Sequence, residues 1–179
     1  MKYLVGARGS KLSMAQTNWV ISELKKVNPD SEYEIKPITT KGDTDTRPLF
    51  TIEQKGIFEK EIDKAVAEKE VDFAVHSLKD VPSQLADNLV IASIPKREKV
   101  NDVFISSDGS TLDKIKPGSV VGTSSLRRAV QVSRQRSDVT VKPIRGNIET
   151  RINKASGETY DAIVLAQAGI SRLGVDIKS

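Results

Sequence analysis

Residues 71–82 read VDFAVHSLKDVP, a stretch in which an apolar run gives way to a cluster of polar side chains. The apolar part, residues 71–75, contains β-branched valines and predicts a strand. The polar groups that follow it at once are His76, Ser77, Lys79 and Asp80. In an open α/β sheet, ligands bind at the carboxyl ends of strands. The stretch therefore indicates the edge of a functional site, although an ordinary strand exit with a solvated Lys–Asp pair explains it equally well.

Apolar patterns typical of strands and of helices alternate along the rest of the chain. Strands are predicted at residues 2–7, 33–40, 71–75, 89–94, 103–106, 120–122, 140–144 and 162–165. Helices are predicted at residues 11–27, 58–69 and 126–136, around Arg151, and through Ala168 and Leu173. Ser10 is a suitable N-cap for the first helix. The alternation predicts an α/β fold with mainly parallel mixed sheets flanked by helices.

The composition excludes several classes of protein. The 179 residues include no cysteine and one histidine, so there is no disulfide framework, thiolate nucleophile or histidine-rich metal site, and we expect no metal. No apolar run is long enough to span a bilayer, and the one at the N-terminus is too short for a signal peptide. We therefore expect a cytoplasmic protein that has no membrane partner.

Two polar segments divide the chain. Residues 95–101, PKREKVN, separate two strand patterns and predict a hinge between a first domain at 1–98 and a second at 99–179. Residues 41–56, KGDTDTRPLFTIEQKG, are polar and lack periodicity. A loop of this length inside a compact domain is usually functional or mobile, so we expect a lid here.

Positive charge is concentrated in a short part of the chain. The formal net charge is +4, but residues 123–151 carry seven Arg or Lys against two Asp or Glu, a net of +5. Such a region should bind an anion, which is either nucleic acid or a ligand with phosphate or several carboxylate groups. Aromatic residues that stack on single strands are nearly absent there, and no helix-turn-helix or RNA-binding signature is evident. We therefore favour a small anionic ligand and expect no nucleic acid.

Two turns within this region have the form of anion sites. Residues 122–128, GTSSLRR, run from a strand into hydroxyl residues at a helix start, where backbone N–H groups and the helix dipole favour an anion. The two arginines can hold a carboxylate in two-point geometry. A capped helix with surface arginines usually explains one such turn, but residues 144–151, IRGNIETR, repeat the arrangement. Arg8, in a glycine-flanked turn before Ser10, suits a third anion site.

The polar cluster after residue 75 contains groups suited to acid–base chemistry, namely His76 and Asp80. With Ser77 they lie too close together in the sequence to indicate a hydrolase triad. The G-x-S-x-G elbow and the Walker motif are both absent. The residues by themselves therefore leave the reaction open.

Seven blocks, in order along the chain, resemble those of the porphobilinogen deaminase family. They are GARGSKLSMAQ at 6–16, TKGD at 40–43, KGIFEKEID at 55–63, VDFAVHSLKDVP at 71–82, GTSSLRR at 122–128, IRGNIETR at 144–151 and YDAIVLAQAGISRLG at 160–174. The resemblance implies two hinged domains similar to periplasmic binding proteins. It implies a transferase of haem-type tetrapyrrole biosynthesis that condenses four porphobilinogen molecules into hydroxymethylbilane and releases ammonia. The product grows on a covalently bound dipyrromethane cofactor.

The resemblance also implies roles for individual residues. Asp80 is expected to be catalytic, stabilising the cation left by loss of ammonia and handling the proton that the coupled pyrrole carbon later loses. We expect surrounding guanidinium groups to keep Asp80 ionised. The arginines expected to bind pyrrole carboxylates are Arg8, Arg127, Arg128, Arg145, Arg151 and Arg172. The other expected contacts to substrate or cofactor are Ser10, Lys55, His76, Ser77, Lys79, Thr123, Ser124, Ser125, Gly146, Asn147, Ala168 and Gly169.

The sequence departs from the family pattern at two points. Glu53 and Gln54 precede Lys55, where many relatives have two glycines, and the cysteine that attaches the cofactor in a third domain is not among the 179 residues. We expect the second domain to be incomplete, and the chain alone to be a monomer that neither carries the covalent cofactor nor turns over. The alternative is a hinged module that binds polycarboxylates without catalysis, and Asp80 argues against it because a pure anion trap has little use for an acid.

Overall fold

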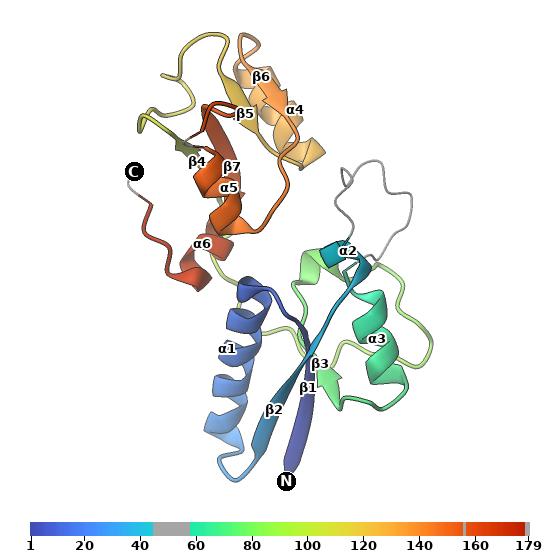
Figure 1. Cartoon of the computed structure of the whole chain (residues 1–179). Helices are drawn as coiled ribbons and strands as arrows, with labels where there is room; N and C mark the ends of the chain where they lie inside the picture. Colours follow the sequence, from blue (N-terminus) through green and yellow to red (C-terminus); the bar gives the residue numbers. More distant parts are fainter. Residues whose placement is uncertain (45–57, 156, 178–179) are drawn as a thin grey trace. The chain divides into compact units, whose positions relative to one another are not determined.

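The structure, a computed structural model, describes residues 1–44, 58–155 and 157–177. The chain forms two compact units, and it passes from the first to the second between Lys96 and Arg97, within the charged segment 95–101 (Figure 1). Each unit has its own sheet. The predicted α/β class with mainly parallel sheets is confirmed.

The first unit contains a three-stranded sheet in the order β2-β1-β3, with both pairs of strands parallel. Its elements are β1 (Lys2–Arg8), α1 (Lys11–Val27), β2 (Glu32–Ile38), α2 (Lys41–Thr44), α3 (Lys60–Ala67), β3 (Phe73–Ala74) and a 3-10 turn, η2 (Leu78–Asp80). The central strand β1 packs against α1 and α3, so Val5 and Ala7 are fully buried. Ser10 is the N-cap of α1, as predicted, and its hydroxyl accepts from the Ser13 N–H at 3.3 Å.

The second unit contains a four-stranded sheet in the order β4-β7-β5-β6. Its elements are β4 (Asp102–Ser106), β5 (Val120–Gly122), α4 (Leu126–Gln135), β6 (Thr140–Lys142), α5 (Ile148–Lys154), β7 (Ala162–Ala166) and α6 (Gln167–Leu173). Strand β4 is antiparallel to β7, and the β5–β6 and β5–β7 pairs are parallel. The sheet is therefore mixed but mainly parallel.

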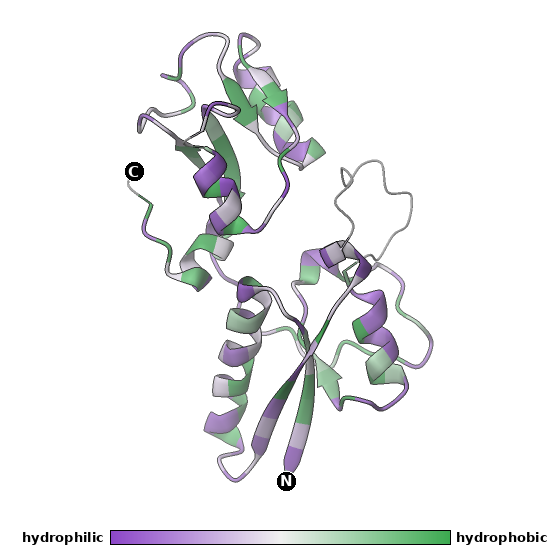
Figure 2. Cartoon of the chain, viewed as in Figure 1, coloured by the Kyte–Doolittle hydropathy of each residue, from purple (hydrophilic) through white to green (hydrophobic). Residues whose placement is uncertain are grey.

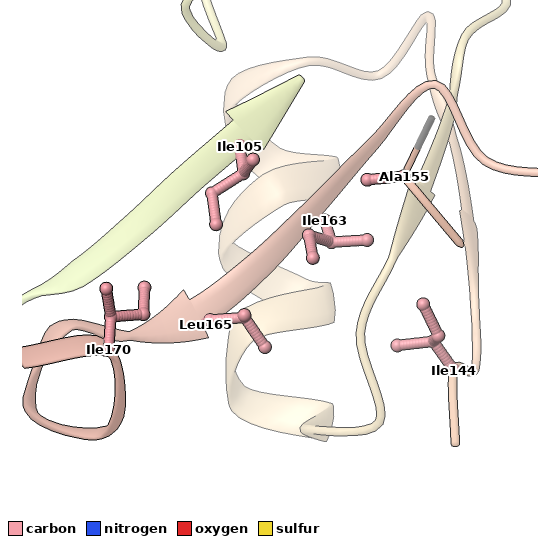
Figure 3. Packing of buried hydrophobic residues seen from close by; sticks show 6 residues of the cluster. All are labelled: Ile105, Ile144, Ala155, Ile163, Leu165 and Ile170. Atoms are coloured by element: carbon pink, nitrogen blue, oxygen red, sulfur yellow. The ribbon is translucent and has the colours of Figure 1, made fainter. Parts of the chain in front are cut away.

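Strand β7 is buried on both faces, and for this reason its sequence is continuously apolar rather than alternating. Figure 2 shows β5 and β7 as strongly hydrophobic strands. On one face of β7, Ile163 and Leu165 join the cluster of Figure 3. On the other face, Ala162 and Val164 join a second cluster with Val121. The alternation of side chains across a strand thus divides the core of this unit into two layers.

An aspartate precedes the site-bearing strand of each unit and fixes its register in the same way. The Asp72 N–H donates to the Leu4 carbonyl at 2.8 Å, while its Oδ2 accepts from the Leu4 N–H at 2.7 Å. The Asp161 N–H donates to the Val120 carbonyl at 2.9 Å, and its Oδ2 accepts from the Val120 N–H at 2.7 Å. These bonds fix where β3 and β7 end, and therefore fix the positions of η2 and α6, which follow them.

Three predicted segments differ in the structure. Residues 89–94 form no strand, and Val90 and Ile94 are 82% and 66% exposed, because no strand of the described residues pairs with them. The strand predicted at 71–75 shortens to two residues. The start of the predicted lid is helical, since Lys41–Thr44 forms α2, whereas residues 45–56, including Lys55, lie outside the described residues.

Candidate functional site

At the end of β1, Arg8 is already paired with a carboxylate of its own unit. Its Nε donates to Asp43 Oδ1 at 3.2 Å, and its terminal nitrogen Nη2 bonds to the same oxygen. Asp43 Oδ2 accepts from the N–H and hydroxyl of Thr40 at 3.1 and 2.8 Å. Burial would raise the pKa of Asp43, but the hydrogen bonds from Arg8 and Thr40 outweigh it and hold this pKa below its ordinary value. The Arg8 guanidinium also lies 4.2 Å from the ring centroid of Phe58.

Asp80 lies on η2, directly after the strand end that the sequence singled out. Its backbone N–H donates to the Ser77 carbonyl at 2.8 Å, and its Oδ1 accepts from Lys79 Nζ at 2.9 Å. The expectation that guanidinium groups keep Asp80 ionised stays a prediction. Within the first unit, the charge of Asp80 acts on the buried carboxyl of Glu59, so at least one other acid lies near it.

Ser77 is held by a residue of α1 that sequence reasoning missed. The Ser77 hydroxyl donates to Gln16 Oε1 at 2.9 Å, although the two residues are 61 positions apart. Gln16 is the last residue of the GARGSKLSMAQ block, and its place in that block is the one sequence feature that could have pointed to it. The bond ties the start of η2 to α1, and so helps to fix the backbone that carries Asp80.

His76 and Glu59 lie among the acids of this unit. His76 Nε2 is 3.3 Å from Asp63 Oδ1, yet it is buried, and within the described ranges no partner meets it in hydrogen-bonding geometry. Glu59 is 4% exposed, and its Oε2 accepts from the Phe58 N–H at 3.3 Å. Burial raises the pKa of Glu59, and the charges of Asp63 and Asp80 raise it further against the opposing effect of His76. Sequence reasoning missed Glu59 because an acid at a helix start is usually solvated.

Replacing Glu59 by glutamine is expected to stabilise the chain at neutral pH by about 1 kcal/mol. A raised pKa in the folded state means that folding favours the protonated carboxyl. The cost therefore appears as the pH rises through that pKa, and it is absent below the ordinary glutamate pKa of about 4.3. Urea denaturation at pH 7 and pH 4 checks this, with exposed Glu68→Gln as the control. A loss of stability at pH 7, or the same gain at both pH values, would contradict it.

In the second unit, hydroxyl groups hold the two predicted anion turns together. Ser124 Oγ donates to the Ile144 carbonyl and accepts from the Ile144 N–H at 3.2 Å, which joins GTSSLRR to IRGNIETR. Ser125 is the N-cap of α4, and its Oγ accepts from the Arg128 N–H at 3.4 Å. Thr123 is buried, and its Oγ1 accepts from the Ser125 N–H at 3.2 Å. These three hydroxyls build the turns that carry the arginines.

Arg127 and Arg128 share one carboxylate, which sequence reasoning did not foresee. Arg128 Nη2 donates to Asp102 Oδ1 at 2.7 Å, and Arg127 Nη2 donates to Asp102 Oδ2 at 3.2 Å. Burial raises the pKa of Asp102, but the two guanidinium groups outweigh it and lower this pKa overall. Arg128 Nε is buried and has no hydrogen-bond acceptor among the residues that the structure describes.

Arg151 is half-buried on α5, and its Nε donates to the Gly146 carbonyl at 2.8 Å rather than to a carboxylate. Burial lowers the pKa of Arg151, and the positive charges of Arg128 and Arg145 lower it further. The structure therefore brings three of the predicted arginines close enough to act on one another. Such a cluster is stabilised by an anion.

Gly146 and Asn147 shape the turn from which Arg151 projects. Gly146 has a φ of +119°, and a Cβ there would lie 2.7 Å from Thr150 Cγ2, so the position requires glycine. Asn147 is the N-cap of α5, and its Oδ1 accepts from the N–H and hydroxyl of Thr150, both at 2.8 Å. Both residues are thus structural parts of the turn.

The remaining predicted residues lie on α6. Ala168 and Gly169 are in its first turn, and the Gln167 N–H there donates to the Asn101 carbonyl at 3.0 Å. Arg172 is in the last turn of α6, and within the described part of the chain no hydrogen bond or ion pair joins it to the other arginines. Within the described ranges, no helix could span a membrane, and no three His, Asp or Glu side chains gather as a metal site.

The chain is thus an α/β protein with clustered guanidinium groups in one unit and carboxyls near a histidine in the other. The model of the family described as "Porphobilinogen deaminase, dipyromethane cofactor binding domain" matches residues 3–179. The chain belongs to the porphobilinogen deaminase family, as the resemblance predicted.

Curated relatives carry the same name. The chain is 85% identical over 178 residues to "Probable porphobilinogen deaminase" of Nitrosopumilus maritimus, covering 99% of this chain and 57% of that protein. It is 52% identical to "Porphobilinogen deaminase" of Listeria innocua, covering 97% and 56%, and 52% identical to that of Bacillus velezensis, covering 95% and 55%. The chain therefore spans little more than half the length of these relatives.

Proposed function

We propose that this chain forms the substrate-binding part of a porphobilinogen deaminase, which condenses four porphobilinogen molecules into hydroxymethylbilane and releases ammonia. The observation that carries the proposal is the half-buried Arg151, which has Arg128 and Arg145 as positive neighbours and a carbonyl as its hydrogen-bond acceptor. We further propose that the two units are domains 1–98 and 99–179, hinged in the manner of periplasmic binding proteins.

The chemistry of the substrate matches this cluster of arginines. Porphobilinogen carries an acetate and a propionate, so an oligomer of it is a polycarboxylate, and guanidinium groups bind carboxylates in two-point geometry. The orphaned Nε–H of Arg128 supplies a buried donor for such a group. Arg8 and Arg127 would share their guanidinium groups between a ligand and the aspartates they already contact.

The same residues fit the dipyrromethane cofactor, which is also a polycarboxylate. Arg128, Arg145 and Arg151 would hold its carboxylates, and the backbone of the Thr123–Ser125 turn would add donors. When bound, the cofactor supplies the pyrrole end to which the first substrate unit is joined. The 179 residues contain no cysteine, so the thioether implied by the family resemblance is not made within them.

Asp80 is proposed to be the catalytic residue. A carboxylate beside the reacting pyrrole stabilises the cation left when ammonia departs, and it can accept the proton that the coupled pyrrole carbon later loses. Lys79 Nζ donates to Asp80 Oδ1 at 2.9 Å, and Ser77 and His76 lie just before Asp80 at the end of the strand. The predicted cytoplasmic location, the monomeric state, the absence of a nucleic-acid partner and the role of Lys55 stay predictions.

Two measurements test the proposal. In the first, the part of this chain that aligns with the Nitrosopumilus maritimus relative replaces the matching part of that protein, and the chimera is assayed for ammonia release from porphobilinogen. In the second, calorimetry measures the binding of porphobilinogen to the 179-residue chain alone. We expect turnover by the chimera, and binding of porphobilinogen without ammonia release by the 179-residue chain alone. A chimera that binds porphobilinogen but releases no ammonia, while the intact relative works, would favour the binding module without catalysis.

A further inference from the structure

Asp102 holds two arginines of the second unit from a fixed position on the sheet. It opens β4 and lies opposite Ala166, the last residue of β7, in the antiparallel register. The preceding carbonyl, that of Asn101, accepts from the Gln167 N–H at 3.0 Å. Backbone bonds on both sides therefore fix the start of the strand from which the Asp102 carboxylate projects.

The carboxylate of Asp102 orients Arg128 and leaves part of it available. The side chains of Arg128 and Asp102 are 16% and 24% exposed, so the 2.7 Å bond between Nη2 and Oδ1 is partly shielded from water. The bond occupies one terminal nitrogen, while Nε stays buried without an acceptor. Because the guanidinium is planar, fixing one nitrogen also fixes the direction of the Nε–H, which can then meet a second carboxylate.

Asp102 also balances the charge of the cluster. The guanidinium groups of Arg127 and Arg128 act on the Asp102 carboxylate, and its negative charge in turn offsets part of theirs. Arg127, which is 62% exposed, bonds to the second oxygen of Asp102 at 3.2 Å. One fixed carboxylate thus restrains two neighbouring arginines and lowers the net positive charge that an incoming anion meets.

We propose that Asp102 is a positioning residue that gives the site its preference for organic carboxylates over small inorganic anions. By holding Arg127 and Arg128 in place, it presents donors at the spacing that a carboxylate on a flat pyrrole can use. By its own charge, it weakens the attraction for every anion, and inorganic phosphate lacks the two separate carboxylates through which porphobilinogen can use several fixed arginines at once. This inference rests on the proposed function, because it names what selects the ligand at the same site.

The test compares Asp102→Asn with a matched control in the same unit, Asp138→Asn. Asp138 also pairs with an arginine, Arg136, through bonds of 2.8 and 2.7 Å, so the control removes one charge and one Arg–Asp pair outside the cluster. Calorimetry gives the dissociation constants of porphobilinogen and inorganic phosphate for the 179-residue chain in low-chloride buffer. Asp102→Asn should bind porphobilinogen about tenfold more weakly, as expected for a lost charge-assisted contact. Its phosphate affinity should stay equal or rise, so the ratio of affinities falls at least about tenfold.

The other outcomes separate the possible errors. We expect Asp138→Asn to leave the ratio unchanged and Asp102→Glu to restore part of it. An unchanged ratio in Asp102→Asn, an equal fall in both affinities, or a rise in both would overturn the inference. If the unmodified chain binds tricarballylate but not porphobilinogen, the proposed function fails. The role of Asp102 is then decided by the ratio of tricarballylate to phosphate affinity.

Discussion

Replacing Asp80 by asparagine is expected to lower turnover of the chimera by about 10²–10⁴-fold, the usual contribution of a general acid or base. Asparagine keeps the shape of the side chain and can still accept a hydrogen bond from Lys79, which lies 2.9 Å away in the native chain. It has no negative charge to stabilise the cation left by loss of ammonia, and it cannot take up the pyrrole proton. The effect should therefore fall on the chemical step.

The decisive observation for Asp80→Asn is whether kcat falls while the affinity for porphobilinogen is retained. Porphobilinogen binding should change little, because the arginine cluster that supplies most of the proposed affinity lies in the second unit. Ammonia release measured under saturating substrate gives the change in kcat, and calorimetry gives the change in affinity. The exposed Asp87→Asn removes an acid from the same unit as a control. Lost binding with surviving turnover would show that the roles of Asp80 and the arginines are assigned wrongly.

Most of the fold follows from local sequence patterns. The strand at residues 162–165 is predicted because four consecutive apolar residues suit a strand buried on both faces, as β7 is. Residues 89–94 have a similar apolar character but form no strand, since a strand also needs a neighbour to accept its hydrogen bonds. A single sequence shows the tendency of a segment and not the presence of its partner.

The candidate site is predictable only in part, for a related reason. The turns at residues 122–128 and 144–151 are visible because hydroxyls, glycine and arginines stand together in the sequence. Their counter-charges are not visible, since Asp43 lies 35 positions from Arg8, and Asp102 lies 26 from Arg128. The neighbours of Asp80 are equally hidden, since the sequence does not show that Glu59, whose pKa the charge of Asp80 raises, packs near it.

Replacing Ile163 by alanine is expected to destabilise the second unit by about 2–5 kcal/mol, the cost of removing a fully buried aliphatic side chain. Ile163 is 0% exposed and lies within the cluster of Figure 3, on a strand that is flanked on both sides in the sheet by β4 and β5. The surrounding strands cannot easily move in to fill the cavity. The control is Val130→Ala on α4, which is 57% exposed and should change stability by less than about 0.5 kcal/mol.

The destabilisation caused by Ile163→Ala should extend to the turn at residues 122–128 as well as to the core. A Cβ added at Gly122 would lie 3.1 Å from Ile163 Cγ2, so the side chain packs closely against the start of GTSSLRR. Native-state hydrogen exchange should therefore show faster exchange at Val121 and in the first turn of α4, with little change at Val5 of the first unit. Urea denaturation gives the total free energy of unfolding. If Ile163→Ala cost no more than Val130→Ala, or if Val5 and Val121 exchanged faster to the same degree, the separate tightly packed core inferred for this unit would be wrong.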